Sequence, residues 1–557
     1  MPNSLFRKKS LSTIISDAEH GVTDGHGSGS LKKILGVRDL TAMGIAAVIG
    51  AGIFSTIGQA AYNGGPGVVF LFLITGVTCG FTALCYAEFA SRVPVAGSAY
   101  TYSYVTFGEL VAWVLGWALI LEYAIGNVVV SISWSSYFVN LLDGVGLHLP
   151  TWLATDPTTA EAMYTSALAA SKPVDGMAWT IAPVVAGYKF ICNLPAFVII
   201  ILVTMLAYVG IKESRSMANV MVGLKLVVLV VIVGIGLFYI DSDNWTPFLP
   251  NGFNGVLKGV SAVFFAYIGF DAISTTAEEC ANPQRDLPKG MIYSLVICTI
   301  IYVIVTLVIT GMVNYSEFDS VADPLAYVFE KIDLNKIGFF VSISAVVAAT
   351  SVLLVFQIGQ PRIWMAMSRD GLMPKRFGNI HPKHHTPAFA TIVTGVIVAI
   401  PSLFVESALM TDLTSIGTLF AFAIVCGGVL LLPAKVSGGE KRFNLPYINS
   451  QWIVPVLFIV FVYFLRQRLS DAFTNLSHES YQEILFILFI IIAAVITFYS
   501  FVRKLSLIPV LGMLCCLYLM IEIPARSWLV FFGWMGFGLI LYFCYGYWKS
   551  KLALRNV

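Results

Sequence analysis

The sequence predicts an all-α protein that crosses a membrane many times. Hydrophobic residues make up 58% of the 557 residues, whereas charged residues make up only 11%. A soluble domain carries about 25% charged residues, so this chain has too few charges to build a water-facing surface. The apolar residues form long continuous runs, which excludes the short alternating segments of an outer-membrane β-barrel.

Composition excludes other classes of protein as well. High hydrophobicity with low charge excludes a disordered chain, and a net charge of +2 gives a nucleic-acid partner no electrostatic support. Most of the 9 cysteines lie within apolar runs, where we expect them to pack as small hydrophobic side chains. No Cys/His spacing is typical of zinc. We expect neither a metal nor another cofactor, and the lipid bilayer as the surrounding medium.

The apolar runs set the number of spans. Since a membrane-spanning helix needs about 20 apolar residues, we expect about 14 spans. They lie near residues 39–62, 67–90, 108–140, 189–210, 217–240, 255–279, 289–313, 335–367, 387–406, 411–433, 451–467, 481–501, 505–523 and 527–547. Lys and Arg are concentrated in the loops on the N-terminal side, which predicts cytoplasmic termini in a plasma or inner membrane. The start of the chain, with Arg7, Lys8 and Lys9, is expected to lie on the membrane surface.

The first span contains two glycines near its middle, in the run Ile49-Gly50-Ala51-Gly52. Glycine lowers the cost of leaving helical geometry, and non-helical backbone at this depth persists only beside a polar cavity or inside protein. An unwound segment exposes N–H groups that suit a carboxylate and carbonyls that suit an ammonium. Close packing of helices through small residues is the alternative explanation.

The sixth span has a matching interruption, in the run from Phe265 to Asp271 that contains Gly269. Interrupted helices at corresponding places in two halves of a chain indicate a transporter's binding site. We expect an amino acid's carboxylate at the N–H groups of Gly50, Ala51 and Gly52. Its ammonium should meet carbonyls near Val48 or Ile49 in the first break and those of Phe265, Ala266 or Ile268 in the second.

Seven stretches carry a resemblance to a known family. They are Ile49–Phe54, Cys85–Pro94, Ala96–Tyr102, Gly116–Tyr123, Phe265–Asp271, Asn282–Pro288 and Met367–Pro374. They resemble the amino acid–polyamine–organocation superfamily, and within it the bacterial branch of the cationic amino acid transporter family. The resemblance implies a leucine-transporter-like fold of two inverted five-helix repeats, amino acid substrates and alternating access. An accessory subunit accompanies some related carriers, but this sequence gives no indication of one.

The resemblance also divides the chain. It implies a cytoplasmic tail (1–38), a first repeat of spans 1 to 5 (39–240), a second repeat of spans 6 to 10 (255–433), four additional spans (451–547) and a C-terminal cytoplasmic tail (548–557). The role of the additional spans stays open.

Lys225 lies eight residues beyond Met217, which places it about 12 Å into the fifth span at 1.5 Å per residue. Its long stem allows the ammonium to reach back to the cytoplasmic interface. We favour the other interpretation, a buried ammonium that exchanges a proton during transport. The resemblance implies that such a lysine replaces the sodium ion that bridges spans 1 and 8 in sodium-coupled relatives.

Other charged residues also fall within or beside spans. Glu122 lies midway along the third span, where an intramembrane carboxylate contacts substrate, relays a proton or ties helices together. Asp271 follows the second break and is expected to cap the inner half-helix. We expect inner-gate or loop ion pairs among Glu88, Arg92, Arg285 and Asp286.

The resemblance aligns Phe356, in the eighth span, with a position at which the cation-carrying relatives have a small residue. A bulky ring there favours a neutral amino acid such as alanine over arginine or lysine. The sequence thus predicts a secondary active amino acid transporter that is proton-coupled or independent of sodium. The alternatives are a cationic amino acid transporter or exchanger and, more remotely, an amino acid sensor or a membrane-embedded transferase. We expect no enzyme, because no acid–base residues gather at one interface.

Overall fold

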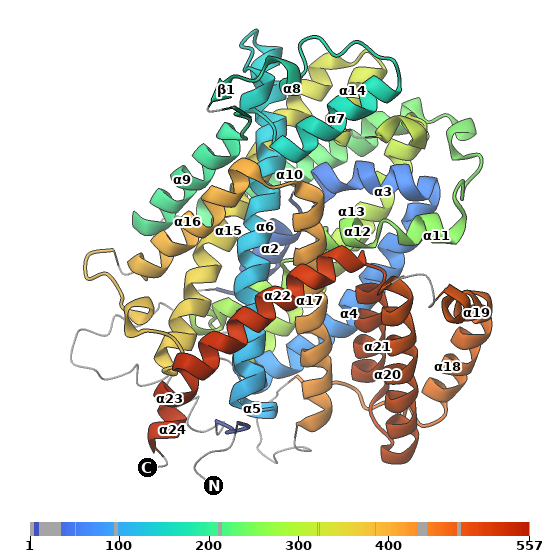
Figure 1. Ribbon diagram of the computed structural model, residues 1–557. Helices are drawn as coiled ribbons and strands as arrows, with labels where there is room; N and C mark the ends of the chain where they lie inside the picture. Colours follow the sequence, from blue (N-terminus) through green and yellow to red (C-terminus); the bar gives the residue numbers. More distant parts are fainter. Residues whose placement is uncertain are drawn as a thin grey trace.

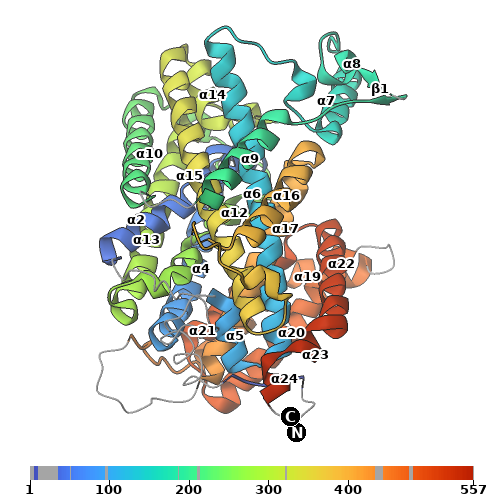
Figure 2. The same cartoon turned by 90° about the vertical axis from the view of Figure 1, so that its left-hand side faces the viewer.

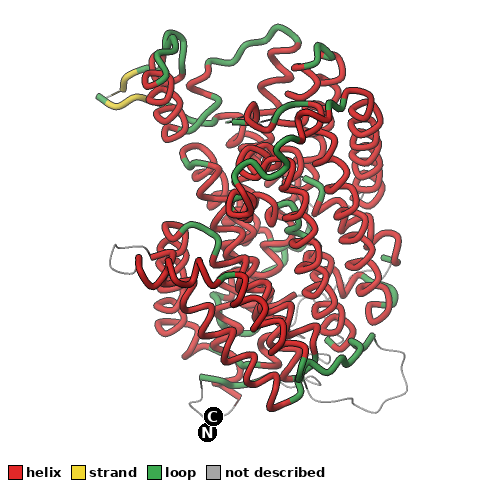
Figure 3. Tube along the Cα trace, turned by 90° about the vertical axis from the view of Figure 1, so that its right-hand side faces the viewer, coloured by secondary structure: helices red, strands yellow, loops and turns green. Residues whose placement is uncertain are grey.

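The computed structural model describes residues 5–9, 35–50, 52–93, 98–185, 187–209, 214–319, 321, 323–384, 386–432, 443–475 and 481–555. Helices make up most of this part of the chain (Figure 1). Its only two strands, β1 (Val184–Val185) and β2 (Tyr188–Lys189), form a hairpin that projects from one end of the molecule (Figures 2 and 3).

The first half of the chain contains α2 (Val37–Val48), α3 (Ile57–Gly64), α4 (Val68–Arg92), α5 (Ser98–Thr106), α6 (Glu109–Gly144), α7 (Pro157–Ala169), α8 (Ala178–Ile181), α9 (Leu194–Val209), α10 (Ser214–Gly236), α11 (Gly252–Leu257) and α12 (Val260–Phe265). A π-helical turn, η1 (Gly52–Thr56), lies between α2 and α3, and a 3₁₀ segment, η6 (Phe270–Glu279), follows α12.

The second half contains α13 (Pro283–Met312), α14 (Pro324–Lys331), α15 (Asn335–Arg369), α16 (Ala388–Phe404), α17 (Ser407–Leu431), α18 (Ile453–Phe464), α19 (Arg466–Asn475), α20 (Tyr481–Arg503), α21 (Leu507–Ile521), α22 (Ala525–Leu541), α23 (Tyr547–Lys549) and α24 (Lys551–Arg555).

Eight helical segments of the described chain are long and apolar enough to cross a membrane. They are Val37–Arg92, Glu109–Gly144, Val220–Tyr239, Pro283–Met312, Asn335–Arg369, Ser407–Leu431, Gln482–Arg503 and Ala525–Lys549. Four shorter apolar helices accompany them, at Leu194–Val209, Val260–Ser274, Ala388–Phe404 and Leu507–Ile521. The protein is therefore a polytopic helical membrane protein, as the sequence predicts, while the total of 14 spans stays a prediction.

The centre of the molecule is formed by α6 and α15, which pack closely through glycine. A Cβ atom on Gly126 would lie 3.1 Å from the Phe356 ring, and one on Gly359 would lie 2.8 Å from the Tyr123 ring. In the most apolar window of α6, 94% of the residues are buried. These two helices therefore form a rigid wall behind the broken first and sixth spans.

Two predicted spans differ in form from the expectation. The inner half of the sixth span is the 3₁₀ segment η6 rather than an α-helix, because Gly269, at φ 116°, turns the chain before it. The predicted span 451–467 is not straight: α18 ends at Phe464 and the chain bends by 65° into the polar helix α19. Arg466 and Arg468 follow the bend, and Arg468 forms an ion pair with Glu522.

Residues 5–9 pack on other parts of the chain, and their place on the membrane surface stays a prediction. The buried Arg7 forms an ion pair with Glu109 at 3.5 Å, and Lys9 donates to Asp370 at 3.0 Å. The Glu109 carboxylate also accepts hydrogen bonds from Tyr542 and Ser550. Burying a cation is tolerated here because a buried carboxylate faces it.

Candidate substrate site at two helix breaks

The first span is broken where the glycines predict. The helix α2 ends at Val48, and Ile49 adopts an extended conformation (φ −77°, ψ 97°). The π-turn η1 begins at Gly52. Ala51, the third predicted carboxylate ligand, lies outside the described residues.

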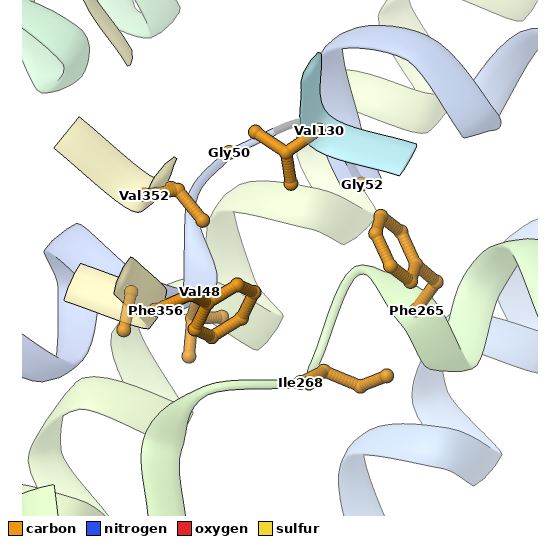
Figure 4. A pocket seen from close by; sticks show the side chains of 9 residues that line it. Val48, Gly50, Gly52, Val130, Phe265, Ile268, Val352 and Phe356 are labelled. Carbon is orange, nitrogen blue, oxygen red and sulfur yellow. The ribbon is translucent and has the colours of Figure 1, made fainter. Parts of the chain in front are cut away.

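A small cavity lies beside this break (Figure 4). Its walls come from the first, third, sixth and eighth predicted spans: Ala47, Val48, Gly50, Gly52, Val130, Phe265, Ile268, Val352 and Phe356. The side chains of Val130, Phe265, Ile268, Val352 and Phe356 converge on the same space (Figure 4). All of them are apolar, so the polar groups available to a ligand are those of the backbone.

The two breaks touch each other, which requires glycine. A Cβ atom on Gly52 would lie 2.3 Å from the Cα of Ala266, and one on Gly269 would lie 2.9 Å from the carbonyl oxygen of Ala47. One on Gly50 would lie 2.5 Å from a methyl group of Val352. Any larger residue would force these segments apart.

The break leaves backbone donors unpaired. No hydrogen bond joins the N–H groups of Gly50 and Gly52 to another described residue. In the second break, Phe265 O accepts a hydrogen bond from Ile268 N at 3.3 Å, whereas the carbonyls of Ala266 and Ile268 accept none from the described chain. An amino acid backbone needs donors for its carboxylate and acceptors for its ammonium, and the two breaks supply both kinds.

The expectation for the first-break carbonyls needs a correction. Val48 O accepts a hydrogen bond from the Tyr302 hydroxyl at 2.9 Å, and Ile49 O accepts one from Lys225 Nζ at 2.8 Å. Because neighbouring helices already supply donors, these two carbonyls are poor candidates for an ammonium. Sequence reasoning missed this because it could not place Tyr302, which lies within the apolar run of α13.

Lys225 is buried, with a fractional exposure of 0%. Its ammonium donates to Ala46 O at 3.0 Å and to Ile49 O at 2.8 Å, both at the end of α2. The side chain therefore does not extend to the cytoplasmic interface. It makes the contact with the broken first span that the sequence predicts, while its part in coupling stays a prediction.

The two intramembrane carboxylates lie close enough to interact electrostatically but do not line the cavity. Glu122 and Asp271 are 3% and 1% exposed, and one oxygen of each has no hydrogen-bond partner in the described chain. Asp271 is the second residue of η6 and so lies in its first turn, while its role as a cap stays a prediction.

The four predicted gate residues form two local pairs. Arg92 contacts Glu88 at 2.5 Å, one turn apart on α4, and Arg285 contacts its neighbour Asp286 at 3.1 Å at the start of α13. Each of the two pairs lies within a single helix, so neither pair supports a gate between helices.

Three wall residues, Ala47, Val130 and Val352, escaped the sequence reasoning. A usable signal exists for Val130, because Glu122, Gly126 and Val130 are spaced four residues apart and so share one face of α6. Val352 lies one helical turn before Phe356 on α15 and follows from the same rule.

A cavity between two broken helices is typical of one class, the polytopic membrane proteins that bind a small solute within the bilayer. Comparison with known proteins is more specific. A family model described as amino acid permease matches residues 35–496, and one described as the C-terminus of the permease matches residues 505–550. The chain belongs to the amino acid permease family, a family of transporters rather than enzymes.

Similar proteins from bacteria and plants are also transporters. The chain is 41% identical to the branched-chain amino acid permease BcaP of Bacillus subtilis (strain 168), over 84% of this chain and 92% of that protein. It is 34% identical to the methylthioribose transporter of the same organism, over 100% of both chains. It is 36% identical to the vacuolar cationic amino acid transporter 2 of Arabidopsis thaliana, over 77% of this chain and 63% of that protein.

Proposed function

We propose that this permease carries neutral amino acids with small or medium apolar side chains, such as alanine, across a cell membrane by alternating access. The observation that carries the proposal is the cavity itself, which has unpaired backbone groups at both breaks and only apolar side chains around them. The carboxylate would bind the N–H groups of Gly50 and Gly52. The ammonium would bind the carbonyls of Ala266 and Ile268.

The wall of the cavity supports a neutral substrate. Val130, Val352 and Phe356 offer neither a carboxylate nor a hydrogen-bond acceptor to a charged side chain. An arginine or lysine side chain would lose its hydration there without compensation, which is expensive. A cationic substrate remains the second candidate, because plant relatives are named for cationic amino acids.

We further propose that Lys225 takes the place of a coupling sodium ion. A fixed ammonium bound to Ala46 O and Ile49 O fills the position where a cation would hold the end of α2. Loss of its proton would release both carbonyls and loosen the inner half of the first span. Protonation would then change the relative stability of the outward and inward states, as coupling requires. Glu122, buried in α6, is a further residue that we propose as a relay for the proton.

The arrangement of spans is part of the same proposal. We place two inverted repeats at 39–240 and 255–433, followed by four additional spans at 451–547. We further place the protein in the plasma membrane, with both termini in the cytoplasm. The two matched breaks, one in each repeat, support this division.

A thermal-shift screen of the twenty amino acids and methylthioribose tests the substrate class. A ligand that binds the folded state raises its apparent stability by mass action. We expect alanine or a similar apolar amino acid to give the largest shift. If arginine or lysine gives the largest shift in unfolding temperature, the protein is a cationic amino acid transporter instead. If only methylthioribose gives a shift, amino acids are excluded as substrates.

Transport itself is tested by counterflow of labelled alanine in proteoliposomes. A carrier accelerates uptake when unlabelled substrate is present inside the vesicle. Binding in the thermal assay without such acceleration would identify a sensor instead of a transporter.

A further inference from the structure

The segment between α6 and α9 folds into a small unit of its own outside the transport site. Its interior contains Ala160, Ala182 and Ile191, with Trp152 and Trp179 packed against them. Its base is fixed: Asn193 N donates to Leu403 O at 2.9 Å, and Ser135 donates to the Asn193 side chain at 2.6 Å. The unit is therefore a folded attachment rather than a loose loop, and its hairpin β1–β2 projects sideways beyond the helices (Figure 2).

The hairpin carries exposed apolar side chains on both of its faces. The fractional exposures of Ile181, Val184, Tyr188 and Phe190 are 47%, 65%, 81% and 45%. Val184 pairs with Lys189 and so shares its face, whereas Tyr188 and Phe190 point to the other face. Single exposed apolar residues are ordinary, but several on one small hairpin mark a segment that contacts something apolar. A water-facing hairpin would be expected to carry charges in these positions.

Exposed apolar side chains continue into the helix that follows the hairpin. Along α9, the exposed side chains are Leu194, Val198, Leu202, Met205, Leu206 and Val209, which recur at helical spacing on one face. In a membrane permease such an apolar outer stripe faces lipid. The exposed Phe190 at the end of the hairpin comes four residues before the exposed Leu194 at the start of α9, so the exposed apolar side chains of the hairpin lie close in the chain to those of the membrane helix.

The charge pattern agrees with contact to a bilayer. Lys189 is the only charged residue between Asp175 and Lys212. Its ammonium donates to Trp179 O at 2.6 Å and lies 4.4 Å from the centre of the Trp179 ring. Tyrosine and tryptophan beside a lysine are typical of the interface between headgroups and acyl chains.

We propose that the hairpin lies on the outer leaflet of the bilayer and inserts Ile181, Val184, Tyr188 and Phe190 at the boundary between headgroups and acyl chains. The partner of these side chains is thus lipid, and the inference does not depend on which solute is carried. Because the unit is anchored to α6 and α16, lipid contact would hold the outer ends of these helices at a fixed depth.

Nitroxide labels at single introduced cysteines measure this depth in the full chain. Eight of the nine native cysteines are buried or half-buried, and only Cys544 is exposed. All labelled variants are therefore made in a Cys544→Ser protein, which also serves as the control without an introduced cysteine. The labelled variants are Tyr188→Cys and Val184→Cys on the hairpin. Leu202→Cys on α9 is the control for lipid, and Glu161→Cys on the exposed surface of α7 is the control for water.

The variants are reconstituted at about one protein per vesicle in phosphatidylethanolamine and phosphatidylglycerol. Collision rates with oxygen, which concentrates in lipid, are compared with those of a water-soluble nickel chelate. We expect the oxygen-to-nickel ratio at positions 188 and 184 to exceed that at 161 by roughly threefold or more. A ratio equal to that at 161 would place the hairpin in water and overturn the proposal. Protection from both reagents would identify a protein cover, which would also overturn it.

Discussion

The two helix breaks satisfy their backbone groups in different ways. At the first break, other helices supply the donors: Lys225 of α10 binds the carbonyls of Ala46 and Ile49, and Tyr302 of α13 binds that of Val48. The geometry of this segment therefore depends on contacts between residues far apart in sequence.

At the second break, the chain closes on itself. The N–H groups of Ala266, Tyr267 and Ile268 each donate to a carbonyl three residues earlier, and Gly269 turns the chain into η6. A turn whose N–H groups are paired locally depends less on its neighbours for its shape. The difference indicates that the first break depends more on contacts with other helices, which is why we propose that a coupling proton acts on its donors.

The largest expected effect comes from Lys225→Ala. The substitution leaves two buried carbonyls without a donor, at about 1–3 kcal/mol for each. The initial rate of labelled alanine uptake into proteoliposomes should fall by roughly 50-fold or more. Lys258→Ala, which removes an exposed lysine at the outer end of the sixth span, is the matched control and should stay near the wild-type rate. Equal rates for the two variants would remove Lys225 from the mechanism.

Gly52→Ala tests whether the breaks must touch. The new Cβ atom would lie 2.3 Å from the Cα of Ala266, so the two segments have to separate. Overpacking of this kind costs about 1–3 kcal/mol, and alanine affinity in the thermal-shift assay should fall roughly tenfold. Gly80→Ala on α4 adds the same methyl group where no heavy atom lies within 4 Å. If both variants bind alanine equally well, the contact between the breaks is not needed.

Phe356→Ser tests the side-chain wall. The ring lies 5.4 Å from that of Tyr123 and fills one side of the cavity, so its removal should admit longer substrates. Inhibition of alanine uptake by leucine or methionine should strengthen roughly five- to tenfold. The pocket assignment fails if wild-type uptake is inhibited best by arginine or lysine and Phe356→Ser leaves that order unchanged.

Tyr302→Phe compares the two breaks directly. It removes one hydroxyl from Val48 O, at about 1 kcal/mol, and should raise the KM for alanine roughly fivefold. Tyr267→Phe is the matched control, because this hydroxyl also binds a carbonyl, that of Phe72 on α4, but does not hold the first break. A larger effect from Tyr267→Phe would contradict the idea that the first break depends more on its donors.

The smallest effect concerns Asp323, the residue immediately before α14. Burial raises the pKa of this carboxyl above its usual range, while the hydrogen bond from Asn140 opposes the shift. The folded protein therefore holds this proton more tightly than the unfolded chain, so stability falls as pH rises from the usual aspartate range through the raised pKa. Asp323→Asn should remove this dependence, which amounts to less than about 2 °C in the midpoint of thermal unfolding. Identical pH profiles for the two proteins would contradict the prediction.

The sequence was informative wherever one residue type has few structural uses. Paired glycines within an apolar run predicted the first break, Gly269 with the charged Asp271 predicted the second, and a lysine eight residues into a span predicted a buried cation. The 3₁₀ form of η6 could not be predicted, because the residue pattern after Gly269 gives no sign of how tightly the half-helix winds. Tyr302 and Val352 were missed for a related reason: their roles depend on which helices meet, and local sequence carries little of that information. The bend after Phe464 arises where a polar, basic segment follows α18 too closely for a straight span.

The central claim is that the Lys225 ammonium does the work of a coupling sodium ion at the first break. Uptake of labelled alanine by the wild-type protein, measured while sodium is replaced by choline and the outside pH is varied, tests it most directly. We predict uptake that is unchanged by the replacement and falls as outside pH rises, with little uptake left in Lys225→Ala under any condition. Sodium-dependent uptake, together with an unimpaired Lys225→Ala variant, would contradict the claim and leave Lys225 as a structural contact alone.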